Sequence, residues 1–196
     1  VSGLFAVLFG LPIGVILSLT RKKALWENSS LNLSLGFIVN ATRSIPFIIL
    51  MLAIIPFTRF IVGTSIGIKA AIVPLGLAAI PFFARIVEIA INEVPHGLIE
   101  SGLTMGASPF QIIKKILIPE SLPAITSGLT LTIINLVGYS AMAGAIGGGG
   151  LGSLAYHYGY QRFDTTIMLL TVIILILLVQ TIQTIGDYVV HKILNH

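Results

Sequence analysis

Long apolar runs separated by short polar stretches restrict what this chain can fold into more than any other feature. Five runs have the roughly 20 mostly apolar residues that cross a bilayer. They cover residues 1–20, 36–58, 68–92, 122–146 and 165–187. Only 9% of the 196 residues are charged, whereas soluble domains carry about 25%. The sequence therefore predicts an all-α membrane protein with five transmembrane helices, organised as one domain over residues 1–196.

The charges around the first run distinguish it from a cleaved signal peptide. It has no basic start, and the cluster Arg21-Lys22-Lys23 follows the apolar residues instead of preceding them. That order is typical of a spanning helix. Because no initiator Met precedes Val1, we expect this first span to be truncated at its N-terminus.

The distribution of Lys and Arg predicts the orientation of the chain, because loops that face the cytoplasm carry an excess of both. With the N-terminus outside, eight of the eleven basic residues lie on or near the inner side: Arg21, Lys22, Lys23, Arg43, Arg85, Lys114, Lys115 and Lys192. The other three are Arg59, Lys69 and Arg162. The prediction is a multi-pass chain whose C-terminus is cytoplasmic, and the basic excess is assigned to membrane loops, with no nucleic acid as partner.

Charged residues and prolines inside the runs predict local features of the spans. Arg43 is expected near the inner end of its span, as an anchor whose guanidinium reaches the head groups. Pro46 and Pro56 lack a backbone donor and are expected to bend the ends of that helix. Arg85 and Glu88 are three residues apart, so they can pair on one helix face. For this pair, a structural role is favoured over one in gating.

Small and polar residues indicate how the spans pack. Gly10 and Gly14 form a small-xxx-small pair that allows two helices to approach closely, although a chain with 20 glycines also contains such pairs by chance. In the fourth run, Thr132, Asn135 and Tyr139 are spaced so that they share one helix face. Such a stripe either forms hydrogen bonds between helices or lines a translocation path, and both interpretations stay open.

Glycines and aromatic residues gather between the last two runs. Residues 144–152 lack the Lys-Ser/Thr ending of a phosphate loop. A tight connection with positive φ angles is predicted there instead. The aromatic residues that follow fit an interfacial belt or a contact with an external partner; they are Tyr156, Tyr158, Tyr160 and Phe163.

The stretch at residues 95–119, between the third and fourth runs, is too polar to span a membrane and too well punctuated to be disordered. Residues 96–105 are predicted to form a short helix that ends at Gly106. Residues 108–111, Ser-Pro-Phe-Gln, form a capping-box signature with proline at the first helical position. They start a second helix, which Pro119 is expected to close.

The two predicted helices carry apolar side chains that need a cover. These residues are Ile99, Leu103, Phe110, Ile113 and Leu117. Three surfaces can bury such side chains: the membrane surface, the spans of the chain itself, or a partner protein. Composition alone favours the membrane surface.

Four residues of this stretch stand at fixed distances from one another: Glu100, Gly106, Ile116 and Pro119. Their spacing resembles the coupling motif of ABC importer permeases, E-A-A-x3-G-x9-I-x-L-P. Ser101 and Gly102 replace the two alanines of that motif, and Ile118 replaces its leucine. The resemblance implies that the segment docks on a separate ATPase through Glu100, Ser101, Gly102, Gly106, Ala107, Ile116 and Pro119.

A wider similarity extends over residues 1–190. It is carried by residues 43–50, 55–59, 62–67, 136–142, 149–152 and 158–160. Here the chain resembles the permease subunits of methionine ABC importers. The resemblance implies a homodimer in the bacterial inner (cytoplasmic) membrane, with two ATP-binding subunits that hold ATP-Mg and a lipid-anchored substrate-binding protein. It also implies a translocation path for D- and L-methionine.

The sequence contains no arrangement typical of a catalytic or cofactor site. It has no phosphate loop, no histidine pair with metal-ligand spacing and no nucleophile beside a base. We therefore expect a subunit that is not an enzyme and that binds no metal or cofactor itself. Two alternatives stay open: a permease for another small solute in the same importer class, and a secondary transporter independent of an ATPase. A secondary transporter typically carries acidic relays at mid-membrane.

Overall fold

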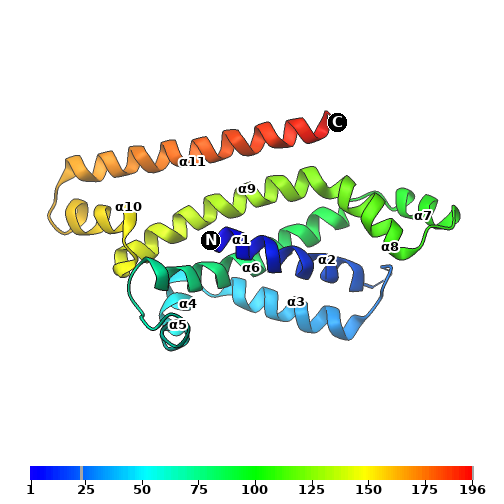
Figure 1. Ribbon diagram of the computed structural model, residues 1–196, viewed down its shortest axis with the longest axis horizontal. Helices are drawn as coiled ribbons and strands as arrows, with labels where there is room; N and C mark the ends of the chain where they lie inside the picture. The colour runs from blue at the N-terminus through cyan, green and yellow to red at the C-terminus, as the bar shows by residue number, and fades with distance from the viewer. Residues whose placement is uncertain (23, 196) are drawn as a thin grey trace.

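The computed structural model describes residues 1–22 and 24–195, and every regular element within them is helical (Figure 1). The α-helices are α1 Ser2–Phe5, α2 Leu11–Thr20, α3 Ser29–Ser44, α4 Phe47–Ala53, α5 Ile55–Val62, α6 Ile68–Asn92, α7 His96–Thr104, α8 Pro109–Ile112, α9 Ile118–Ala143, α10 Gly150–Leu154 and α11 Thr165–Leu194. The π-helical turns are η1 Ala6–Gly10, η2 Ile113–Leu117, η3 Gly144–Gly148 and η4 Ala155–Tyr160. The predicted all-α class is confirmed. Lys23, one of the basic residues used to predict the orientation, lies outside the described residues.

Within the described part of the chain, four helical stretches are long and apolar enough to cross a bilayer as they stand. They are Ser2–Thr20, Ile68–Asn92, Pro109–Gly148 and Thr165–Leu194. A fifth span results if α3 and α4, which meet at an angle of 102°, are taken together. Counted in this way, the described residues contain five candidate spans, as predicted. The bounds of the third, residues 68–92, are those of α6.

The second span differs from its prediction, because it starts earlier and is broken. α3 begins at Ser29, where the Asn28 side chain accepts a hydrogen bond from a backbone N–H and caps the first turn. It ends at Ser44, and a new helix direction starts after Pro46, so the predicted bend at Pro46 is confirmed. The single helix predicted over residues 36–58 is wrong, since proline restricts the backbone before it and removes a donor.

The early start of α3 changes the position of Arg43. Arg43 lies in the last turn of α3, about 21 Å along the helix from Ser29 at 1.5 Å per residue. The start of α3 lies beside the end of α2, where Asn32 Nδ2 donates to the Leu17 carbonyl at 2.7 Å. Arg43 is therefore far from that end of the bundle, and its predicted position near the inner end of the span is wrong. The prediction at Pro56 holds, since Pro56 lies in the first turn of α5 after the break at α4.

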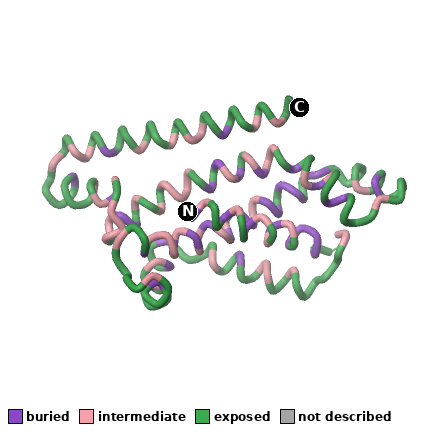
Figure 2. The backbone as a smooth tube through the Cα atoms, in the orientation of Figure 1, coloured by how far each residue is buried: buried purple, intermediate pink, exposed green. Residues whose placement is uncertain are grey.

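α6 is the centre of the fold and is covered by helices on several sides (Figure 2). Half of its most apolar stretch is buried inside the chain. α2 approaches α6 closely, because a Cβ at Gly14 would lie 2.6 Å from Val87 Cβ. A Cβ at Gly10 would lie 2.8 Å from the Ile80 carbonyl oxygen. The glycine pair therefore has a packing role, which decides the question that the sequence left open.

α11 runs beside α9 and leaves most of its surface uncovered (Figures 1 and 2). Only 6% of its most apolar stretch is buried. The close contact with α9 depends on Gly186, where a Cβ would lie 2.8 Å from Thr130 Cβ. The uncovered side chains of α11 are mostly Ile, Leu and Val, which suits a helix that faces lipid or another subunit.

The turn between α9 and α11 lies at the end of the bundle opposite to residues 95–119 (Figure 1). Gly147, Gly149 and Gly150 have φ angles of 98°, 76° and 76°. These values confirm the predicted tight connection with positive φ. The Gly67 N–H donates to the Gly147 carbonyl at 3.0 Å, which ties the loop before α6 to this turn.

Candidate functional site

Residues 95–119, named segment 95–119 from here on, contain α7, a turn, α8 and η2 (Figure 1). α7 ends in a Schellman motif. The Gly106 N–H donates to the Leu103 carbonyl, and the Ala107 N–H donates to the carbonyl of residue 102, each at 3.0 Å. Gly106 has a φ of +81°, which a residue with a Cβ adopts only with strain. The predicted end of the first helix at Gly106 is confirmed.

A capping box starts the second helix. Ser108 Oγ accepts a hydrogen bond from the Gln111 N–H at 3.3 Å, and Gln111 Oε1 accepts one from the Ser108 N–H at 2.8 Å. Pro109 occupies the first turn of α8. The prediction from residues 108–111 is confirmed, so local contacts alone account for the turn between α7 and α8.

The second helix does not stop at Pro119, and the predicted end there is wrong. α8, η2 and α9 form one continuous helical stretch from Pro109 to Ala143. The helical backbone is interrupted only beyond it, at Ile146 and Gly147 of η3. Pro119 lies in the first turn of α9, directly after the π-helical turn η2. A proline in a helix requires a local change in hydrogen bonding, and a π turn supplies one. Segment 95–119 is therefore a direct extension of the fourth span.

The seven residues predicted to dock on an ATPase divide into an exposed set and a packed set. The exposed residues are Glu100, Ser101, Gly106 and Pro119. The buried or half-buried residues are Gly102, Ala107 and Ile116. A Cβ at Gly102 would lie 2.9 Å from Ile116 Cδ1, so the small residue allows α7 to approach η2. Gly102 and Ile116 therefore hold the segment together, while Glu100 and Ser101 lie on its surface.

The apolar side chains of the segment divide in the same way. Ile113 and Leu117 are buried against the spans of the chain, and Ile99 packs on the same core. Leu103 and Phe110 remain uncovered, with 47% and 66% of their surface exposed. The chain itself therefore supplies the cover for one group of apolar residues and leaves the other group free.

Met105 is the most exposed apolar side chain of the segment, although it is not among the apolar residues predicted from the sequence to need a cover. It is 86% exposed and forms the C-cap of α7. Its position directly before Gly106 is the signal that identifies it, because a side chain at a helix end is not covered by a following turn. Met105, Leu103 and Phe110 are named the apolar tip from here on.

The polar stripe of α9 does not have a uniform environment. Thr132 is 1% exposed, and its Oγ1 donates to the Gly128 carbonyl of the same helix at 2.7 Å. Asn135 and Tyr139 are half-buried. The Tyr139 ring stacks on Phe47 of α4, with centroids 4.6 Å apart and 7° between the planes. The stripe therefore runs from a buried position toward the break in the second span.

Charged residues lie inside the same spans. Arg85 Nη1 of α6 is 2.8 Å from Glu88 Oε2, so the predicted pair is formed. The guanidinium carbon of Arg43 lies 5.9 Å from the centre of the Phe82 ring, within the range of a cation–π contact. Phe82 and Arg85 are one turn apart on α6 and share a face. Arg43 of α3 and Arg85 of α6 therefore lie on the same side of the α3–α6 pair.

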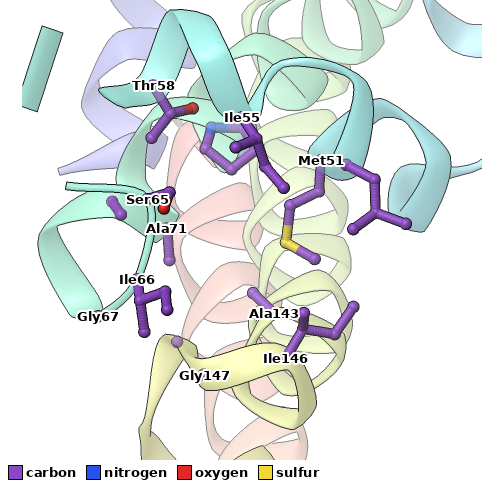
Figure 3. Close-up of a pocket in the computed structure, with 14 residues that line it drawn as sticks. Met51, Ile55, Thr58, Ser65, Ile66, Gly67, Ala71, Ala143, Ile146 and Gly147 are labelled. Atoms are coloured by element: carbon purple, nitrogen blue, oxygen red, sulfur yellow. The ribbon is translucent and has the colours of Figure 1, made fainter. Parts of the chain in front are cut away.

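A small cavity of about 40 Å³ lies between α4, α5, α6 and η3, away from segment 95–119 (Figure 3). Met51, Ile55, Ile66 and Ile146 are among its lining residues. Figure 3 shows the Met51 side chain pointing from α4 toward the glycine turn, residues 144–152. Its lining contains no ionisable side chain. A cavity of this size and composition holds a few water molecules at most and does not recognise a charged group.

Known proteins resemble this chain along almost its full length. The family model described as "Binding-protein-dependent transport system inner membrane component" matches residues 10–195. A probable D-methionine transport system permease protein MetI of Vibrio cholerae is 55% identical over 193 residues, which are 98% of this chain and 86% of the relative. A methionine import system permease protein MetP of Bacillus subtilis is 47% identical over 178 residues, 91% of this chain and 80% of the relative. A solved structure of the MetNI methionine ABC transporter, in inward-facing conformations, matches with a TM-score of 0.95 and 52% identity, covering 98% of this chain and 89% of that chain.

Proposed function

The chain belongs to the family of binding-protein-dependent transport system inner membrane components, and from this premise we propose that it is the permease subunit of an ATP-driven importer for methionine. The observation that carries the proposal is the agreement in sequence and fold with a methionine ABC transporter over 98% of the chain. Relatives from two organisms, both named for methionine transport, support the same cargo. D- and L-methionine are both proposed as substrates.

Segment 95–119 is the surface that meets a separate ATPase. Large apolar side chains that stand free at the end of a bundle are typical anchors of a protein interface, and the apolar tip consists of three of them. Of the residues proposed for docking, Glu100 and Ser101 contact the partner directly. Gly102 and Ile116 act by keeping α7 against η2.

A continuous helix explains how this contact controls the path. Because α8, η2 and α9 form one stretch, a displacement of segment 95–119 moves the fourth span with it. The two partner ATP-binding subunits would hold ATP-Mg and would close when it binds. The spans of this chain would then alternate between two packings that open the path to one side at a time. The chain itself carries out no covalent chemistry.

The proposed assembly contains two copies of this chain in the bacterial inner membrane. The N-terminus lies outside, while segment 95–119 and the C-terminus are cytoplasmic. A lipid-anchored substrate-binding protein delivers methionine at the outer face, where the exposed aromatic residues Tyr158 and Tyr160 follow the glycine turn. Asn135 and Tyr139 line the path between the copies, and Thr132, which is buried, supports its wall.

The test is uptake of labelled methionine by proteoliposomes that contain the permease, its ATPase and the binding protein. We expect uptake of both stereoisomers of methionine, and we expect this uptake to require ATP hydrolysis by the ATPase. A pure complex that contains no ATPase, or uptake driven by an ion gradient alone, would support a secondary transporter instead. ATP-dependent uptake of another amino acid, without uptake of methionine, would support a different cargo in the same importer class.

A further inference from the structure

Arg43 lies at a depth in the fold where charged side chains are uncommon. Its guanidinium is beside the ring of Phe82. Phe82 is about 15 Å from the end of α6 at Asn92, and Arg43 itself is about 21 Å from the start of α3. With these two helix ends taken at the edge of the hydrocarbon core, which is about 30 Å thick, Arg43 lies near the middle of the membrane.

No carboxylate of the described residues neutralises Arg43. Glu88 is the acidic residue of the neighbouring helix, and its Oε2 is bound to Arg85 Nη1 at 2.8 Å. Arg43 forms no ion pair within residues 1–22 and 24–195. Its described partner is the face of the Phe82 ring, which orients the guanidinium without cancelling its charge. The group of Arg43, Arg85 and Glu88 thus carries one uncompensated positive charge.

The surroundings of Arg43 favour a water-filled path over lipid. An arginine at mid-membrane is unfavourable in lipid, and such residues face a bundle interior or an aqueous cavity. Arg43 is exposed in this chain, so it does not face the interior of the subunit. The backbone breaks directly after it, at Ile45 and Pro46, and interrupted helices at membrane depth occur where they are covered by protein or line an aqueous cavity. Tyr139 packs on Phe47 just beyond the same break.

We infer that Arg43 binds the carboxylate of the substrate as it crosses the membrane, with the Arg85 guanidinium as a second positive group held in place by Glu88. A guanidinium and a carboxylate match in geometry and form two parallel hydrogen bonds. An amino acid always carries that carboxylate, whereas its side chain varies. This inference rests on the proposed function, and it adds a substrate-binding residue to the path.

The experiment measures equilibrium binding of methyl-labelled L-methionine to the whole complex in nanodiscs, without nucleotide or binding protein, by saturation-transfer NMR. Methioninol, which lacks the carboxylate, is measured in the same way. We expect Arg43→Gln to weaken L-methionine binding by about tenfold or more, the cost of one charge-assisted contact, and to leave methioninol binding unchanged. Arg43→Lys retains the charge but not the two parallel hydrogen bonds, so it restores only part of the affinity. Arg59→Gln removes a matched exposed arginine from α5 and leaves both ligands unaffected.

The anionic group that Arg43 binds could come from the substrate or from a lipid head group. Two kinds of nanodisc distinguish these sources: one of phosphatidylcholine alone, and one that also contains phosphatidylglycerol. If the effect of Arg43→Gln occurs only with phosphatidylglycerol, the residue binds a lipid head group, and the inference is wrong. It is also wrong if the wild-type complex binds methionine no more tightly than methioninol.

Uptake by the same wild-type complex, with its binding protein, is measured in parallel. If the wild-type complex takes up methionine and the Arg43→Gln variant binds methionine as tightly as the wild type, the inference is wrong and the proposed function stands. Absence of methionine uptake overturns the proposed cargo and this inference with it.

Discussion

Both ends of the bundle reverse the chain with glycines, but the glycines at the two ends meet different surroundings. At segment 95–119, Gly106 has a positive φ, and a Cβ there would meet no atom within 4 Å. At the opposite end, a Cβ at Gly152 would lie 2.6 Å from Ala141 Cα, and a Cβ at Gly144 would lie 2.8 Å from the Ser153 N. Glycine is therefore required at Gly106 for its backbone angle alone, whereas Gly144 and Gly152 are required for space.

This difference shows how each end is stabilised. The glycine turn keeps its shape because α10 packs directly on the backbone of α9. Segment 95–119 keeps its shape through a Schellman motif and a capping box, and it leaves the apolar tip uncovered. Substitutions at the glycine turn should therefore affect folding, whereas substitutions at segment 95–119 should affect the contact with a partner.

Gly152→Val is expected to have the largest effect. The new side chain would collide with the backbone of α9, and overpacking of this kind costs about 1–3 kcal/mol or more, since backbone atoms cannot move aside as side chains do. The yield of monodisperse complex in size-exclusion chromatography measures the result. Gly138→Ala is the control, because a Cβ at Gly138 meets nothing within 4 Å. A normal yield for Gly152→Val would show that α10 does not need this close packing.

Phe110→Ala is expected to have the next largest effect, and on binding instead of folding. Truncation of a central aromatic anchor costs about 2 kcal/mol or more at an interface, so the ATPase should dissociate roughly 30-fold more readily. Titration of the ATPase onto the permease in nanodiscs measures this. Ile113→Ala is the matched comparison, because Ile113 is buried in the chain and its loss should lower thermal stability. Equal binding by wild type and Phe110→Ala would exclude the apolar tip as the anchor.

Gly106→Val is expected to strain the turn without a steric clash. A β-branched residue at positive φ costs about 1–2 kcal/mol, which the subunit should tolerate with little loss of yield. The bend between α7 and α8 should shift, so ATP hydrolysis continues while methionine uptake falls. Gly106→Asn, which tolerates this conformation, should retain more uptake. Unchanged uptake per ATP hydrolysed in Gly106→Val would contradict a coupling role for the segment.

Glu100→Lys is expected to have the smallest effect. Glu100 is exposed, and an exposed charge contributes at most about 1 kcal/mol, so binding of the ATPase should weaken by a few-fold. The effect should decrease as ionic strength rises, because salt screens surface charges. Glu100→Gln should lie between the wild type and Glu100→Lys. An effect that does not depend on salt would indicate a structural role for this residue.

Local features of the fold were predictable because they depend on neighbours in the sequence. The third span, the helix end at Gly106 and the capping box at Ser108 are set by hydrophobic run length, backbone freedom and side chains within three residues. The stop at Pro119 was predicted wrongly, although it is also a local rule. There the π turn η2 and the packing of Leu117 in the core outweigh the preference of proline for helix ends.

The candidate site was predictable in its position along the chain but not in the surroundings of its residues. The spacing of Glu100, Gly106, Ile116 and Pro119 identifies the segment. It does not reveal that Gly102 contacts Ile116, or that Met105 is more exposed than Phe110. These properties depend on how α7 packs against η2, and the pattern of apolar residues in the sequence does not predict that packing.

The sequence by itself predicted five apolar spans, a capped and hinged segment between the third and the fourth, and a glycine turn before the last. Each of these follows from composition and local backbone chemistry. The tertiary structure decided which apolar residues are covered, that the fourth span continues through Pro119, and that Arg43 lies beside Phe82. The physical reason is that burial and charge environment are set by contacts between residues far apart in the chain, such as α3 with α6.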